Sequence, residues 1–284
     1  MAPNPPAPPN GTVTEGRAGL SLPRQAVART IGRLQSGYQR DVPWAVASVA
    51  RLRREAGRDA HVSPTGWGLD HLETLAELRE ERRTANGEKD GVSPSYFSSP
   101  AYKWRQDQER REDTAVHVAV TLWALHQQSL RDEPMHLLGW SLGRSVRRLA
   151  HEKTGIRVGG TATGDGATAD EIQAAQRVEN ASETVRRRFV RIGAASDTDV
   201  LATRLREMVL LLRAAHIPLD YTLLADQLLL WQDENRRDDV RRAWGRDFHR
   251  RYGPSRQSRP DGAGDTPDID ITSAEDLEWA DADS

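Results

Sequence analysis

The spacing of the apolar residues constrains the fold of this chain more than any other feature of the sequence. After Ser21 and Pro23, which together are typical of a helix start, apolar residues recur three and four positions apart. The same period returns in successive segments up to residue 248, and no run of alternating β-branched residues interrupts it. The sequence therefore predicts an all-α fold, a helical bundle of about eight helices, and leaves open a division into two small subdomains.

Each expected helix carries a stripe of apolar residues that would face the core. In chain order the stripes are Val27, Ile31 and Leu34; Val46, Val49 and Ala50, in a helix opened by Asp41 and Pro43 and running through Arg53; Leu69, Leu72, Leu75 and Leu78; Ala115, Val118, Leu122 and Leu125, within residues 112–129; Leu142, Val146 and Leu149; Val185, Phe189 and Ile192; Leu201, Leu205, Met208, Val209 and Leu212; Leu224, Leu228 and Trp231; and Val240, Ala243, Trp244 and Phe248. Asp220 is expected to cap the helix that carries Leu224, because its carboxylate can accept hydrogen bonds from the free amides there.

Neither end of the chain shows the helical spacing of apolar residues. Half of the first ten residues are proline, so residues 1–20 are predicted to form a disordered arm. Residues 257–284 hold nine acidic residues and one basic residue, a net charge of −8, and are predicted to form a disordered acidic tail. Loops are expected near residues 84–104 and 154–169, which are rich in Gly, Pro and Thr. The predicted helical domain is residues 21–256.

Composition excludes several kinds of site. The chain has no cysteine, which excludes disulfides, thiolate metal sites and cysteine nucleophiles. The eight histidines show no spacing typical of a metal site, so neither a metal nor a cofactor is expected. No segment has the roughly 18–20 apolar residues needed to cross a bilayer, and the start of the chain lacks the order of a secretory signal. We expect a soluble, cytoplasmic protein with no membrane partner.

The segment "HLLGWSLGRSV" contains Gly139, Ser141 and Gly143 in the Gly-x-Ser-x-Gly spacing of a hydrolase nucleophile. Asp220 and His249 follow Ser141 in the hydrolase order. A nucleophile elbow needs a strand of a parallel sheet before the serine, however, and no such sheet is predicted. The alternative interpretation is that the two glycines allow close backbone approach and that Ser141 caps the next helix. A serine hydrolase using Ser141 therefore remains the alternative function, beside a helical scaffold that binds only proteins.

The positive charge of the chain is almost entirely arginine. Of the 40 basic residues only Lys89, Lys103 and Lys153 are lysine, and outside the acidic tail the net charge is +6. Guanidinium groups bind phosphate in a forked geometry and stack on bases, so this composition favours nucleic acid. An arginine-biased genome, or solvated helix faces paired with carboxylates, would explain the same composition without any ligand.

Several arginine-rich motifs occur in one order along the chain. They are "VARLRR", "SLGRSVRRL", "VRRRF", "VRIGAASDTDVLATRLREMVLLLR", "HIPLDYTLLADQLLLWQ" and "VRRAWGRDFHRRY". In order and type they resemble the CasB family, the small subunit of the type I-E CRISPR Cascade surveillance complex. The resemblance extends over residues 41–252 and is closest over residues 141–252. The proline arm, the acidic tail and the longer loops depart from the family pattern.

The resemblance implies a protein without a catalytic residue, present in two copies in a ribonucleoprotein. The partners implied are the backbone and large Cascade subunits, the guide RNA, and the target DNA including its displaced single strand. Such a subunit would stabilise the R-loop in antiviral defence. The family motifs point to Arg53 and Arg54 in "RLRR", Arg144 in "SLGR", and Arg186, Arg187 and Arg188 in "VRRRF" as nucleic-acid-binding residues. Spacing alone adds Arg110, Arg111, Arg147 and Arg148, the last two sharing a helix face with Arg144.

Aromatic residues are divided between the core and a loop. Trp44, Trp123, Trp140, Trp231 and Trp244 lie among apolar neighbours and are expected to pack in the interior. Tyr96, Phe97, Tyr102 and Trp104 are expected in a loop with Lys103 and Arg105, where they would contact a single strand or a neighbouring subunit, or remain disordered.

Overall fold

Helices supply nearly all of the regular structure in the computed structural model, which describes residues 20–62, 70–87, 99–152 and 182–250. Within these ranges no strand forms, and one isolated parallel bridge joins His136 to Leu219. The predicted all-α bundle is therefore confirmed. The arm up to residue 19, the loop over 154–169 and the tail over 257–284 lie outside the described residues. No helix in the described part of the chain is long and apolar enough to span a bilayer.

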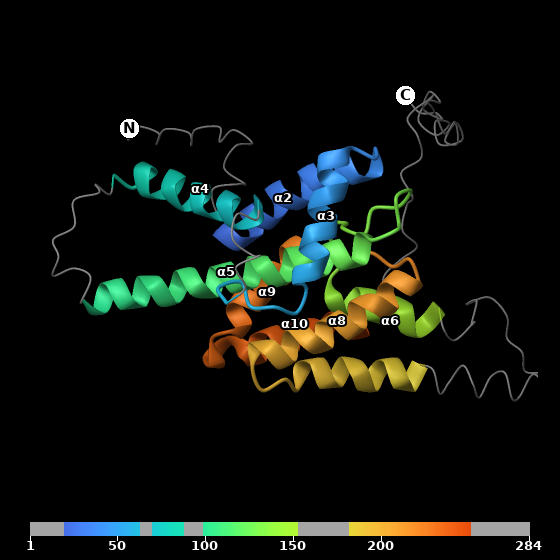
Figure 1. The fold of residues 1–284 in the computed structure, drawn as a ribbon. Coiled ribbons are helices and arrows are strands. Elements are labelled where there is room, and N and C mark those ends of the chain that lie inside the picture. Colours follow the sequence, from blue (N-terminus) through green and yellow to red (C-terminus); the bar gives the residue numbers. More distant parts are fainter. Residues whose placement is uncertain (1–19, 63–69, 88–98, 153–181, 251–284) are drawn as a thin grey trace, which may run out of the picture. The chain divides into compact units, whose positions relative to one another are not determined.

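The helices follow the predicted apolar stripes (Figure 1). Their bounds are α2 Leu22–Gln39, α3 Pro43–Glu55, α4 Asp70–Ala85, α5 Pro100–Gln127, α6 Leu142–Glu152, a helix over residues 182–193, α8 Thr198–Ala214, α9 Tyr221–Trp231, the short 3₁₀ helix η3 Glu234–Arg236, and α10 Arg237–His249.

α5 lies at the centre of the bundle, where it packs against α2, α3, α8 and α9. Its carboxyl-terminal half is buried on nearly every side, and the Trp123 side chain there is fully inaccessible to solvent. Trp231 and Trp244 are buried as expected. Trp44 is not: it is 45% exposed on the first turn of α3, with the Arg33 guanidinium 5.7 Å from its ring centroid. A tryptophan whose face lies beside a cation tolerates such a surface position.

Most of the helix starts that the sequence predicts are found in the structure. The Ser21 hydroxyl accepts a hydrogen bond from the Arg24 amide (3.2 Å) and caps α2. The expectation for Asp41 is wrong, because its backbone has φ +57° and the cap position of α3 is Val42. Pro43 is the first residue of α3, where its fixed φ suits a helix and its missing N–H costs nothing.

α5 begins about twelve residues before residue 112, where the sequence predicts the start of this helix. The Ser99 hydroxyl accepts from the Tyr102 amide (3.1 Å), and Pro100 occupies the first helical position. The loop expected near residues 84–104 is therefore wrong for its final residues: Tyr102, Lys103, Trp104 and Arg105 are helical, and Trp104 is 71% exposed. Tyr96 and Phe97 lie outside the described residues.

Candidate nucleic-acid interface

The Gly-x-Ser-x-Gly segment forms a turn and a helix cap. α6 begins directly after Ser141, whose hydroxyl accepts from the Arg144 amide at 3.4 Å. Ser141 is only 5% exposed, and in the described ranges no strand leads into it. The Asp220 carboxylate accepts from the Gly139 amide (2.8 Å) and, as expected, from the first amides of α9, Thr222 (3.1 Å) and Leu223 (3.0 Å). The predicted caps are confirmed, and the geometry of a nucleophile elbow is not present here.

Gly143 permits the close packing of α6 against α10. A Cβ atom at this position would lie 2.3 Å from the Trp244 carbonyl oxygen and 2.6 Å from the Phe248 amide nitrogen. Gly139 has φ +77°, a conformation that L-residues with side chains rarely adopt. The two glycines thus allow the main chain to turn and α6 to approach α10, as the sequence indicated.

Arg144, Arg147 and Arg148 share α6 but reach in different directions. The Arg144 guanidinium lies 4.2 Å from the Trp140 ring centroid and donates to the Gly139 carbonyl (3.0 Å). The Arg147 guanidinium donates to the Phe248 carbonyl (3.1 Å) at the end of α10. Arg148 is exposed. Since a carbonyl carries no net charge, the contact with Phe248 positions the Arg147 cation without neutralising it.

Arg53 and Arg54 lie on the last turn of α3, where Arg54 is exposed and Arg53 is half-buried. Among the described residues no carboxylate lies within ion-pair distance of either guanidinium. The next arginine, Arg58, does pair with Glu55 at 3.5 Å. Arg110 and Arg111 are exposed on α5, and neither has an ion pair within the described ranges.

Arg186, Arg187 and Arg188 project from the helix over residues 182–193 and are all exposed. Arg187 pairs with Glu183 at 3.0 Å, whereas Arg186 and Arg188 have no carboxylate at ion-pair distance in the part of the chain described. The same helix is anchored to α10 by stacking of Phe189 on Phe248, with ring centroids 5.1 Å apart.

A pocket of about 340 Å³ lies between this helix and α8. Three arginines line it, Arg188 and Arg191 from one helix and Arg204 from the other. The Arg204 guanidinium donates to the Arg191 carbonyl, which ties the two helices together. Arg191 and Arg204 were not predicted from the sequence. The signal for Arg191 was its position three residues after Arg188, but Arg204 joins it only because the two helices pair.

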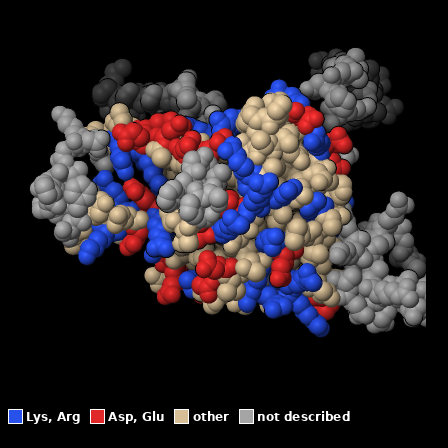
Figure 2. Space-filling view, viewed as in Figure 1, with Lys and Arg blue, Asp and Glu red and all other residues tan. Residues whose placement is uncertain are grey.

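The ten predicted arginines therefore come from four helices rather than from one continuous row. Figure 2 shows Lys and Arg side chains gathered in the middle of one face, over α3, and again at its lower right, over the helix of residues 182–193. Acidic side chains lie between the two areas in this view. Two basic areas thus occupy the same face.

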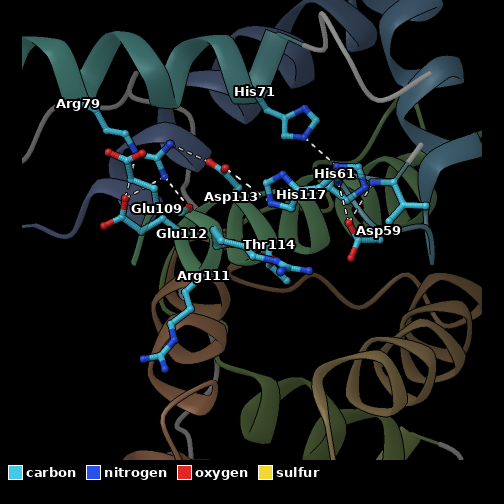
Figure 3. A network of polar contacts seen from close by, with 12 residues as sticks. Asp59, His61, His71, Arg79, Glu109, Arg111, Glu112, Asp113, Thr114 and His117 are labelled. Atoms are coloured by element: carbon cyan, nitrogen blue, oxygen red, sulfur yellow. Dashed lines mark hydrogen bonds and ion pairs between the residues drawn. The ribbon is translucent and has the colours of Figure 1, made fainter. Parts of the chain in front are cut away.

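Apart from these arginines, a cluster of polar side chains joins α4 to α5 (Figure 3). The Arg79 guanidinium donates to the Glu112 carboxylate (3.0 Å) and the Glu109 carbonyl (2.8 Å), and pairs with Asp113 (2.8 Å). Beside it, His71 Nε2 lies 3.1 Å from His117 Nδ1. Burial lowers the pKa of His71 to about 3, and the nearby His117 contributes to this lowering. This cluster fastens two helices, and the described residues contain no group of three or more His, Asp or Glu side chains that could hold a metal ion.

Comparison with known proteins gives one consistent result. Residues 48–249 match the family model described as CRISPR-associated protein Cse2. The crystal structure of CasB from Thermobifida fusca is 33% identical, with a TM-score of 0.55, and the match covers 82% of this chain and 100% of that chain. A Cse2-family CRISPR-associated protein from Thermus thermophilus is 20% identical, with a TM-score of 0.47, over 80% of this chain and 97% of that one. A search of curated protein sequences finds no match.

Proposed function

This chain belongs to the Cse2 (CasB) family of CRISPR-associated proteins, and from that premise we propose that it is the non-catalytic small subunit of a type I-E CRISPR Cascade complex in the cytoplasm. The family resemblance expected over residues 41–252 is confirmed, since the family match covers residues 48–249. We assign the family domain to residues 21–256.

In this role the protein contacts the guide RNA and the target DNA, including the displaced single strand. Its protein partners are the backbone and large subunits and a second copy of itself. Exchange of a DNA duplex for an RNA–DNA hybrid is nearly balanced in free energy, as is known for another RNA-guided effector, so a few contacts to the strand backbones decide whether the R-loop persists. Arginines that are not neutralised within the protein are suited to provide those contacts.

The observation that carries this proposal is the contrast between two kinds of exposed arginine. Arg236, the last residue of η3, and Arg242 on α10 both pair with Asp239, at 3.1 and 2.6 Å. On α3 and on the helix of residues 182–193, Arg54 and Arg186 are also exposed and have no carboxylate at ion-pair distance among the described residues. One group of exposed arginines thus has an acidic partner within the chain, whereas Arg54 and Arg186, which belong to the family motifs, have none in the described ranges.

The non-catalytic assignment is supported by the Ser141 environment. Its hydroxyl accepts from the amide of Arg144 in the first turn of α6. Asp220, the acidic member expected of a triad, is 3% exposed and caps α9. Both side chains therefore have structural partners in place of catalytic ones.

Replacement of Arg53 and Arg54 by alanine tests the proposal. We expect the R53A/R54A chain to bind a fluorescently labelled single-stranded oligonucleotide about tenfold more weakly, because two charge-assisted contacts to phosphate are lost. The slope of log affinity against log salt concentration should decrease by about 1.4, from about 0.7 per phosphate contact on a single strand. Fluorescence anisotropy over a salt series measures both quantities.

The matched control is R236A/R242A, which removes two exposed arginines that both pair with Asp239. It should change the dissociation constant less than twofold, because exposed ion-paired arginines are largely satisfied within the protein. Equal effects of the two double variants would show that only net charge matters and would contradict the assignment. Absence of any binding at low salt would contradict the proposed contact with nucleic acid itself.

A further inference from the structure

Three arginines and two carboxylates, Asp199 and Glu207, line the pocket between the helix of residues 182–193 and α8, so its formal charge is positive. Arg188 and Arg191 are exposed at its edge, and none of Arg188, Arg191 and Arg204 lies within ion-pair distance of a carboxylate in the described part of the chain. Its volume of about 340 Å³ is at the lower end of the range of about 300–1,000 Å³ that is typical of ligand pockets. The pocket is therefore large enough for a phosphate with part of its sugar.

A second, smaller hollow adjoins the arginine pocket at the start of α8. Asp199 and Thr203, on the first turns of α8, line this pocket and also a smaller hollow of about 80 Å³ on the other side. The smaller hollow is bounded by Gly57 and Arg58, directly after the α3 turn that carries Arg53 and Arg54. The two hollows adjoin over the start of α8 and together form a depression there.

We propose that a single nucleic-acid strand crosses the start of α8 along this depression, with one backbone phosphate held in the pocket by Arg188, Arg191 and Arg204. This inference rests on the proposed function and specifies a path for the strand. It adds Arg191 and Arg204 to the interface and makes Thr203 the point that the strand covers.

The surroundings favour backbone contact over base contact. Among the described residues no Trp, Tyr or Phe lines either hollow, so this part of the chain offers no such platform for stacking a base there. The carboxylates of Asp199 and Glu207 at the pocket disfavour a ligand with several adjacent negative charges, such as an acidic peptide, more than a strand with one charge per phosphate. Binding along this path should therefore depend little on base sequence.

The absence of cysteine from the chain allows a direct test. In the T203C variant the introduced thiol would be the only one, and its rate of alkylation reports whether the strand covers it. With a labelled oligothymidine of about 12 nucleotides at about ten times its dissociation constant, we expect alkylation of the full chain to slow about tenfold. The control is A76C, on the exposed side of α4, which should react at the same rate with and without oligonucleotide.

A charge reversal gives a second readout. R191E should weaken oligothymidine binding about tenfold, because a cation that contacts phosphate becomes an anion. R242E, on α10, makes the same change in net charge outside the path and should weaken binding less than threefold. If the oligonucleotide binds but T203C stays unprotected, or if R191E and R242E act alike, the path is wrong while the proposed function stands. If the full chain binds no oligonucleotide at low salt, both fail.

Discussion

Gly143 illustrates how a single missing side chain sets the distance between two helices. Its α-carbon faces the main chain of α10, with the Trp244 carbonyl oxygen and the Phe248 amide nitrogen both inside the space that a Cβ would need. Backbone atoms cannot rotate away as a flexible side chain can. The helix that carries Arg144, Arg147 and Arg148 is therefore positioned by a residue with no functional group.

We expect G143A to lower the free energy of unfolding by about 3 kcal/mol, because the added methyl group overpacks a contact between main chains. Urea denaturation followed by circular dichroism measures the change. Gly245 provides the control: it also lies in a helix, α10, but a methyl group added there would meet no heavy atom of another element within 4 Å. G245A should raise the stability by about 0.5–1 kcal/mol through higher helix propensity. Equal stability of the two variants would contradict this account of the α6–α10 contact.

At the scale of elements, α5 shows which part of the fold the sequence predicts. Its carboxyl-terminal half carries an apolar stripe that predicts a helix, whereas residues 100–111 are mostly polar and their composition favours a loop at the start. That part of the helix is held by charged contacts with α4, such as Arg83 with Glu109 at 2.9 Å and Arg79 with Glu112 at 3.0 Å. Hydrophobic periodicity carries no signal for a helix stabilised in this way.

The same limit applies to the candidate interface. Arg53, Arg54 and the arginines of residues 186–188 lie in local motifs, which a sequence displays directly. Arg204 is separated from Arg191 along the chain, and the pocket that they share exists only where two helices pair. Local patterns therefore indicated the basic helices, but the grouping of their side chains depended on tertiary packing.

The contact between α4 and α5 makes stability depend on pH. Burial holds the pKa of His71 at about 3, against an ordinary value of 6.5, and lowers the pKa of its partner His117. His126, whose Nδ1 lies 2.8 Å from the Tyr221 hydroxyl, also has a pKa of about 3 because it is buried. The unfolded chain binds protons at His71 and His126 as the pH falls below 6.5, and the folded chain does not until the pH approaches 3. The stabilising effect is thus complete above pH 6.5 and is lost as the pH falls toward 3.

We expect the free energy of unfolding to fall as the pH decreases within this window, with a slope that approaches about 1.4 kcal/mol per pH unit for each of His71 and His126 once the pH is well below 6.5. Denaturation between pH 7 and 5.5, where most carboxylates stay ionised, measures the slope. In H71L/H117L the slope should be smaller by at least the contribution of His71, because two groups that take up protons on unfolding are removed. A slope equal to that of the unaltered chain would show that the buried pair does not control the acid response.

For the whole molecule, the binding of a polyanion depends on how charge is distributed along the chain as well as on the net charge. The net charge is −2, but residues 257–284 contribute −8 and the rest of the chain +6. A polyanion approaching the protein meets the sum of these charges at long range and individual arginines only at short range. The acidic segment should therefore weaken and slow the association with nucleic acid.

A chain ending at Arg256 is expected to bind single-stranded DNA several-fold more tightly at low salt than the full chain, with the difference shrinking as salt screens the charges. A full-length variant with the nine carboxylates of residues 257–284 changed to amides separates charge from length. It should behave as the shortened chain does. An unchanged dissociation constant in both variants would contradict the electrostatic effect, and a change confined to the shortened chain would attribute it to length.

Asp220 connects two parts of the molecule that are distant in sequence. One of its carboxylate oxygens accepts from the amides that begin α9, and the other accepts from Gly139, in the turn before α6. The starts of two helices thus share one anchor. Loss of this one carboxylate would therefore remove a hydrogen-bond acceptor from the start of α9 and from the turn before α6 at the same time.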